Sequence, residues 1–175
     1  MSTGEHALTH ADPRQLLRHT LATLAYRSGK VLRDFPEDAV ETRVSPATRT
    51  PLELLSHLGD LMEWAEGLAR GDYRWRAAPS SSWAEASERF LRGLAAVDVA
   101  LAEASPRSHP DEQIFQGPIA DALTHVGQLA MLRGMLGSAV RPESYARAEI
   151  RAGRVGREQA APRAEFDGDA SRPAR

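Results

Sequence analysis

The sequence contains no cysteine, and this absence removes several kinds of chemistry at once. Disulfide bonds, thiolate nucleophiles, cysteine-ligated zinc and iron–sulfur clusters are all excluded. Any metal ion must therefore be held by His, Asp or Glu side chains. The lack of cysteine does not by itself fix the cellular compartment.

A strong charge of one sign and a long apolar run are also missing. Across 175 residues, 22 Lys and Arg oppose 24 Asp and Glu, which leaves a formal net charge of −2. This balance provides no electrostatic footprint for nucleic acid or an anionic membrane. No segment approaches the roughly 20 apolar residues that span a bilayer, and the N-terminus does not resemble a signal peptide. We expect a soluble, cytoplasmic protein that binds neither nucleic acid nor membrane.

The composition is otherwise that of a globular domain, with 42% hydrophobic and 26% charged residues. No segment alternates with a period of two, whereas several show helical periodicity. The expected helices cover residues 13–32, 51–70, 83–104 and 118–136. Four amphipathic helices of this length predict an all-α four-helix bundle.

Boundary signals support these helices. Capping-box patterns occur at Thr50–Glu53 and Ser82–Glu85, and Gly71 and Gly137 are natural stops. Prolines at the first helical position predict helix starts at Pro13, Pro51 and Pro118.

The C-terminal part of the chain lacks this periodicity. We assign residues 1–150 to the bundle and 151–175 to a C-terminal extension that is partly disordered. Within it, Phe166 is the only large apolar anchor after residue 160.

Two of the six histidines, His57 and His125, lie within expected helices next to apolar rows. Asp121 precedes His125 by four residues, so their side chains share one helix face, with Cβ atoms about 5–6 Å apart. This spacing lets one helix offer two ligands to a metal, and His57 on a facing helix is the best third ligand. Nitrogen and carboxylate ligands without sulfur suit Zn²⁺, Ni²⁺, Mn²⁺ or Fe²⁺.

Simpler interpretations stay open. A histidine on an apolar face is usually a core residue, and Asp121 in the first turn of a helix complements the helix dipole without any metal. Trp64 and Gln128 share faces with the candidate ligands and are candidates for substrate binding, although Trp64 also fits ordinary core packing. Arg133 suits either a substrate carboxylate or the surface.

Two segments carry a family resemblance. TPLELLSHLGDLMEWA, at residues 50–65, resembles the second helix of DinB/YfiT-like bundle proteins, in which His precedes a hydrophobic and an acidic residue. DALTHVGQLAMLRGMLGSAV, at residues 121–140, resembles their later helix, in which a ligand, three residues and a His precede a GQ pair. The resemblance extends over about residues 13–140.

The resemblance implies that His57, Asp121 and His125 occupy the three metal-ligand positions. Asp121 departs from the commoner three-His pattern, and the related mycothiol-dependent maleylpyruvate isomerases use Glu there, so the identity of the metal is left open.

The implied function is a divalent-metal-dependent enzyme, with Zn²⁺ the first choice, that acts on a small-molecule substrate. The reaction classes implied are transfer to a low-molecular-weight thiol cosubstrate, or hydrolysis. The alternative is a non-catalytic, stress-associated or interaction protein with a vestigial metal site. A homodimer is left open.

Overall fold

The computed structural model describes residues 12–103 and 109–166, and these residues form an all-α structure without a β-strand. The helices are α1 (Pro13–Leu32), α2 (Pro51–Arg70), α3 (Trp83–Ala102), α4 (Asp111–Ile114) and α5 (Ala120–Met135). A π-helical turn at Phe115–Ile119 joins α4 to α5, and 3-10 turns occur at Glu37–Ala39 and Tyr145–Arg147. The prediction of an all-α protein is confirmed, and α1 and α2 have the predicted bounds.

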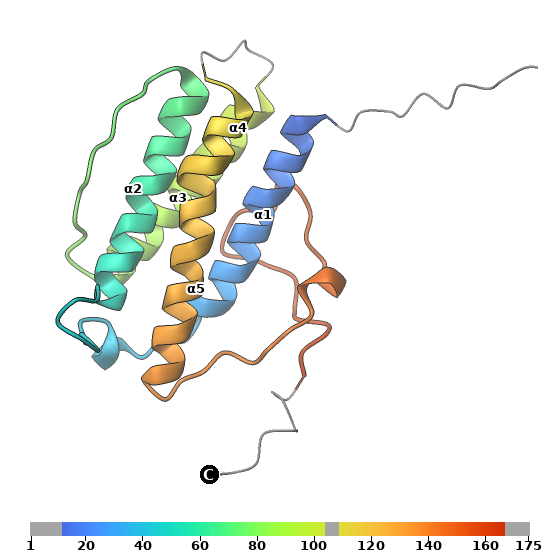
Figure 1. Cartoon of the computed structure of the whole chain (residues 1–175). Helices are drawn as coiled ribbons and strands as arrows, with labels where there is room; N and C mark the ends of the chain where they lie inside the picture. Colours follow the sequence, from blue (N-terminus) through green and yellow to red (C-terminus); the bar gives the residue numbers. More distant parts are fainter. Residues whose placement is uncertain (1–11, 104–108, 167–175) are drawn as a thin grey trace, which may run out of the picture.

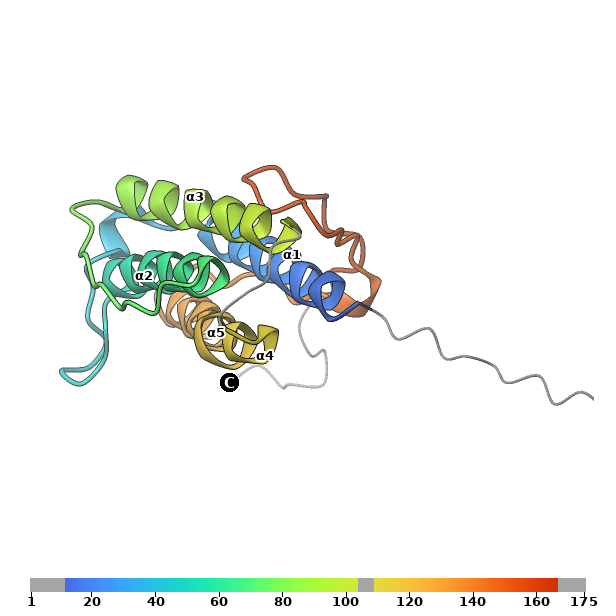
Figure 2. The same cartoon turned by 90° about the horizontal axis from the view of Figure 1, so that it is seen from above.

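The four long helices pack side by side around one core, in the cyclic order α1, α3, α2, α5 (Figure 2). In Figure 1, α2 and α3 run in one direction, and α1 and α5 run in the other. Aliphatic and aromatic side chains from all four helices and from the turn before α5 fill the core. The largest fully buried side chains are those of Phe90, Leu21, Leu24, Leu55, Leu58, Leu61, Met62, Leu68, Leu94, Leu101, Ile114 and Ile119.

Because α2 and α3 are parallel, the connection at residues 71–82 must return along the whole length of α2 (Figure 1). Twelve extended residues reach about 40 Å, which exceeds the roughly 30 Å length of a 20-residue helix. Two hydrogen bonds hold this connection against α2. Ala78 N donates to Asp60 Oδ1 at 3.0 Å, and Ser80 N donates to Ser56 Oγ at 3.2 Å. The connection is thereby fixed beside the face that carries His57.

The expected capping box at Thr50 is present in both directions, since Thr50 Oγ1 accepts from Glu53 N and Glu53 Oε2 accepts from Thr50 N. The second predicted box is only half formed. Ser82 Oγ accepts from Glu85 N, but the Glu85 carboxylate binds the backbone N–H and hydroxyl of Ser81. The helix start at Trp83 is nevertheless the predicted one.

The predicted start of the fourth helix at Pro118 is wrong. The helical chain begins at Asp111, after Pro110, and continues through the π-helical turn into α5. The wider turn accommodates Pro118, which has no N–H to donate. Gly117 lies against the indole of Trp64, where an added Cβ would approach a ring carbon to 3.2 Å. Close packing on α2 therefore explains the glycine that had suggested a helix start.

The chain after α5 turns back and runs along α1 (Figures 1 and 2). Two buried polar contacts fasten it: Tyr26 Oη donates to Glu143 Oε1 at 2.8 Å, and Lys30 Nζ lies 2.9 Å from Glu143 Oε2. Lys30 also pairs with Glu165 at 2.6 Å. Phe166, the expected anchor, is 52% exposed, so charged residues hold this segment instead. The proposed boundary at residue 150 stays a prediction, and the predicted partial disorder of residues 151–175 concerns in part residues 167–175, which lie outside the described ranges.

Candidate metal centre

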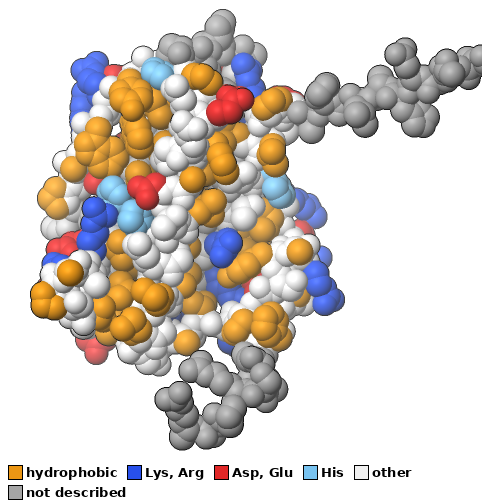
Figure 3. Space-filling view, in the orientation of Figure 1, with side chains coloured by type: hydrophobic (Ala, Val, Ile, Leu, Met, Phe, Trp, Pro, Cys, Tyr) orange, Lys and Arg blue, Asp and Glu red, His pale blue; other side chains and the backbone are white. Residues whose placement is uncertain are grey.

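His57 on α2 and the pair Asp121 and His125 on α5 come together where these two helices pack. Asp121 lies between the two histidines. Its Oδ2 is 3.6 Å from His57 Nε2, and its Oδ1 is 3.3 Å from His125 Nε2. The two imidazole rings meet edge to face, with centroids 4.8 Å apart. In Figure 3, histidine and acidic side chains lie together on the surface of this face, with a basic side chain beside them.

These distances suit one small cation, with a modest adjustment. Ligands about 2.0–2.2 Å from a zinc ion lie at most about 4.4 Å apart. Each contact of Asp121 with a histidine falls within that limit, whereas the three donor atoms as a set spread over up to 4.8 Å. The distances between ligands of one zinc ion therefore describe Asp121 with each histidine, but not the whole set.

The surroundings of His57 favour the neutral imidazole, which is the form that binds a metal. Its side chain is only 17% exposed. Burial lowers the pKa of His57, and the positive charge of Arg49 and the nearby His125 lower it further. Asp121 and Asp60 oppose this shift without reversing it. At neutral pH, His57 therefore carries a free electron pair for coordination.

A buried carboxylate lies behind His57. Asp60 Oδ2 is 3.9 Å from His57 Nδ1, and Asp60 Oδ1 pairs with Arg89 Nη2 at 2.7 Å. Metal-binding histidines commonly face a carboxylate with their second ring nitrogen, which fixes the ring orientation. Asp60 is itself buried. The role of Arg89 could not be inferred from sequence, since α3 is brought to α2 only by packing.

Gln128 holds the other histidine, because its Oε1 lies 2.8 Å from His125 Nδ1. The other ring nitrogen, Nε2, faces Asp121 and is the one placed to bind a metal. Gln128 also lines a cavity of about 330 Å³ together with Arg49 and Met131. The role of Gln128 in substrate binding stays a prediction. Its contact with His125 positions the imidazole ring.

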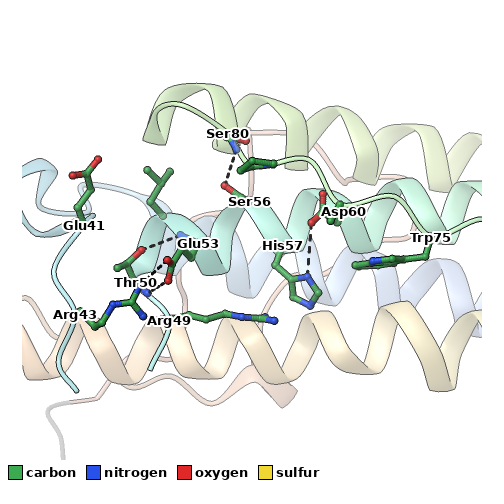
Figure 4. A pocket seen from close by; sticks show the side chains of 13 residues that line it. Glu41, Arg43, Arg49, Thr50, Glu53, Ser56, His57, Asp60, Trp75 and Ser80 are labelled. Carbon is green, nitrogen blue, oxygen red and sulfur yellow. Dashed lines mark hydrogen bonds and ion pairs between the residues drawn. The ribbon is translucent and has the colours of Figure 1, made fainter. Parts of the chain in front are cut away.

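A larger cleft of about 670 Å³ opens beside His57 (Figure 4). It lies between α2, the chain before α2, and the 71–82 connection. Its polar or aromatic lining residues include Arg49, Ser56, His57, Asp60, Trp75 and Ser80. Trp75 meets the His57 ring edge to face, with centroids 5.6 Å apart. Sequence reasoning missed both Arg49 and Trp75, because they lie in connections without a periodic pattern.

Trp64 does not line this cleft. Its indole packs edge to face against Trp75 and Tyr73, with centroids 5.6 and 6.0 Å away. Its Nε1 is buried and has no hydrogen-bond partner in the described part of the chain. Trp64 therefore packs against Trp75, which lines the cleft, without lining the cleft itself. A contact between Trp64 and substrate stays a prediction.

Arg133 binds backbone carbonyl groups and does not line the cleft. Its guanidinium donates to the carbonyls of Val31, Arg33 and Asp34, at and beyond the C-terminal end of α1. Helix ends leave carbonyl groups without intrahelical partners, and a cation there is favourable. The sequence left two roles open for Arg133, binding of a substrate carboxylate and a position on the surface. The structure shows neither, because Arg133 is buried against the end of α1.

Comparisons with known proteins supply no assignment for this site. No family model matches the chain, and neither a curated protein nor a solved structure matches it. The resemblance to DinB/YfiT-like proteins thus rests on the two motifs themselves. Within residues 12–103 and 109–166, no helix combines the length and apolar character needed to cross a membrane.

Proposed function

We propose that His57, Asp121 and His125 bind one divalent metal ion, with Zn²⁺ as the first choice and Ni²⁺, Mn²⁺ and Fe²⁺ as alternatives. The observation that carries this proposal is the position of the Asp121 carboxylate, 3.6 and 3.3 Å from the Nε2 atoms of two histidines on two different helices. Two neutral nitrogen donors and one carboxylate form a familiar three-ligand set that leaves a coordination position open.

We further propose that the protein is a DinB/YfiT-like four-helix bundle with a C-terminal extension, and that it acts as a metal-dependent enzyme. Three observations support this: the parallel packing of α2 and α3, the origin of the ligands on α2 and α5, and the large cleft next to His57. A cleft of about 670 Å³ suits a small-molecule substrate.

The proposed reaction class is transfer to a low-molecular-weight thiol, or hydrolysis. A divalent cation supplies Lewis acidity, which lowers the pKa of a thiol or water that binds to it. Since the chain has no cysteine, the thiol must come from a cosubstrate. Gln128 orients the imidazole of His125, Asp60 lies 3.9 Å from Nδ1 of His57, and Asp121 supplies the only negative charge among the three ligands.

Metal analysis tests the first step. The protein is purified without added metal, and its metal content is compared with that of His57→Ala and of His19→Ala, which removes an exposed histidine of α1. We expect about one equivalent of metal in wild-type protein and His19→Ala, and none in His57→Ala, with unchanged helical content by circular dichroism.

A screen of several cellular thiols and of hydrolysable esters on the metal-loaded protein tests the second step. Turnover that disappears in His57→Ala supports the enzyme. A wild-type protein that binds no metal even after reconstitution contradicts the proposal and favours a non-catalytic protein. Whether the protein is a homodimer, which the sequence leaves open, is testable by light scattering, and the predicted cytoplasmic location is testable by cell fractionation.

A further inference from the structure

Two ion pairs involve charged residues of the large cleft, whereas Glu41 and Arg49, which also line it, form none in the described part of the chain. Arg43 pairs with Glu53 at 2.6 Å, and Asp60 pairs with Arg89 at 2.7 Å. Arg49 also lines the cleft, but it makes no ion pair or side-chain hydrogen bond with any residue in the described ranges. Its side chain extends along the cleft toward the ring of His57 (Figure 4).

The positive charge of Arg49 is unfavourable beside a bound divalent metal ion. The proposed ligand set carries one negative charge, from Asp121, against two positive charges on the ion. Arg49 adds a further positive charge to the same region, because it lines the same cleft as His57. Like charges at such a site repel unless an anion lies between them.

We propose that Arg49 is the anion-binding residue of this cleft and that it holds the carboxylate of a small organic anion whose other end reaches the metal. The proposal rests on the proposed metal site and names the substrate class for it. An arginine fork binds a carboxylate through two parallel hydrogen bonds, and the guanidinium keeps its charge at all physiological pH values.

The remaining cleft lining defines the rest of the ligand. Trp75 is 47% exposed and presents an indole to the cleft next to His57, while Leu52, Ala77 and Pro79 add apolar surface. The buried hydroxyl of Ser80, another lining residue, has no hydrogen-bond partner in the described part of the chain. A planar or apolar organic carboxylate fits this lining better than an inorganic anion.

Benzoate, with benzamide as its neutral counterpart, is the probe for this site. Each is titrated into wild-type protein, Arg49→Gln, Arg49→Lys and Arg92→Gln, with and without zinc, by calorimetry and by tryptophan fluorescence. Arg92→Gln is the matched control, because it removes the same charge from an exposed position of α3 that lines none of the cavities described above. Zinc content is measured for every variant.

We expect Arg49→Gln to weaken benzoate binding by about tenfold or more, as for loss of a charge-assisted bidentate contact. Arg49→Lys should lose less affinity for benzoate, and Arg92→Gln should lose none. Benzamide should bind weakly and equally to wild type and all variants. Zinc content should be unchanged in Arg49→Gln. Equal benzoate affinity of Arg49→Gln and wild type, equal loss in Arg92→Gln, or no binding of millimolar benzoate to wild type would each overturn the inference.

The two proposals fail in different ways. If the protein holds no zinc, yet benzoate binding to the metal-free chain still depends on Arg49, the proposed function fails and the anion site stands. If zinc binds to His57, Asp121 and His125 while benzoate affinity is independent of Arg49, the metal site stands and the anion site fails.

Discussion

Asp121 Oδ2 and His57 Nε2 lie 3.6 Å apart across the contact between α2 and α5. The same carboxylate reaches His125 with its other oxygen at 3.3 Å. Asp121 is also the most exposed of the three residues, at 46% for its side chain. The shared carboxylate therefore sits at the open side of the site, where it can be changed without disturbing the core.

Substitution of Asp121 separates the metal role from folding. Asp121→Asn keeps the shape of the side chain but removes its charge. We expect zinc affinity to fall by about 100-fold or more, because the substitution removes a metal ligand and not only a residue that orients one. The thermal stability of the metal-free protein should change by no more than about 0.5 kcal/mol, as usual for a surface position. Asp121→His should retain metal. A chelator competition assay and thermal melting measure both effects, and equal zinc affinity in Asp121→Asn would contradict the ligand role.

Metal retention should depend on pH through His57. Its pKa is lowered from 6.5, chiefly by burial, so the neutral ring persists in the fold below the pH at which an unfolded histidine takes up a proton. In metal-free protein this contribution to stability is complete above pH 6.5 and is lost as the pH falls through the lowered pKa. We expect zinc to stay bound at pH 6.5 and to be released at lower pH. Metal content after dialysis across pH 7 to 4 measures this, and release already well above pH 6.5 would contradict it.

Arg133 should matter for stability and not for metal binding. Arg133→Met leaves the carbonyls of Val31, Arg33 and Asp34 without this donor in a site where the arginine is only 8% exposed. We expect a loss of about 2–4 kcal/mol in the free energy of unfolding, the cost of several buried acceptors left without a donor. Arg92→Met, at an exposed position of α3, is the control and should cost less than about 0.5 kcal/mol. Urea denaturation measures both, and unchanged zinc content should accompany the loss.

The attachment of the C-terminal segment should weaken in acid. Burial acts to raise the pKa of Glu143, but hydrogen bonds from Lys30 and Tyr26 outweigh it, and the net pKa is lowered from 4.5. The carboxylate thus stabilises the fold above pH 4.5, and this contribution disappears as the pH falls through the lowered pKa. Glu143→Gln should melt at lower temperature than wild type at pH 7, and the difference should shrink as the pH falls below 4.5. A constant difference across this range would contradict the assignment.

Truncation after Gln159 should have a small effect. It removes Glu165, which pairs with Lys30, but Lys30 keeps its pair with the fully buried side chain of Glu143. The side chain of Glu165 is partly exposed and Phe166 largely so, and we expect the melting temperature to fall by only a few degrees. A much larger fall would show that residues after Gln159 are docked more firmly than these contacts indicate.

Local features of the sequence were sufficient for most of the helices. Pro13 and the Thr50–Glu53 box place the starts of α1 and α2, and Gly71 with φ of +93° ends α2, because helix-start prolines, caps and left-handed glycines act within a few residues of one another. The pair of Asp121 and His125 was equally predictable, since four residues of a helix bring two side chains onto one face. The same local reasoning misjudged Gly117–Pro118, because contact with Trp64 and a π-helical turn, not a helix start, account for these residues.

The sequence by itself thus determined the all-α class, the bounds of α1 and α2, and half of the candidate site. Tertiary packing alone decided that His57 meets Asp121, that Asp60 and Arg89 lie behind it, and that Trp75 and Arg49 border its cleft. It also decided that Arg133 caps α1. The physical reason is range: helix caps and i, i+4 neighbours are set by backbone geometry, whereas contacts between α2, α3, α5 and the connections depend on how buried side chains of the whole chain fit together.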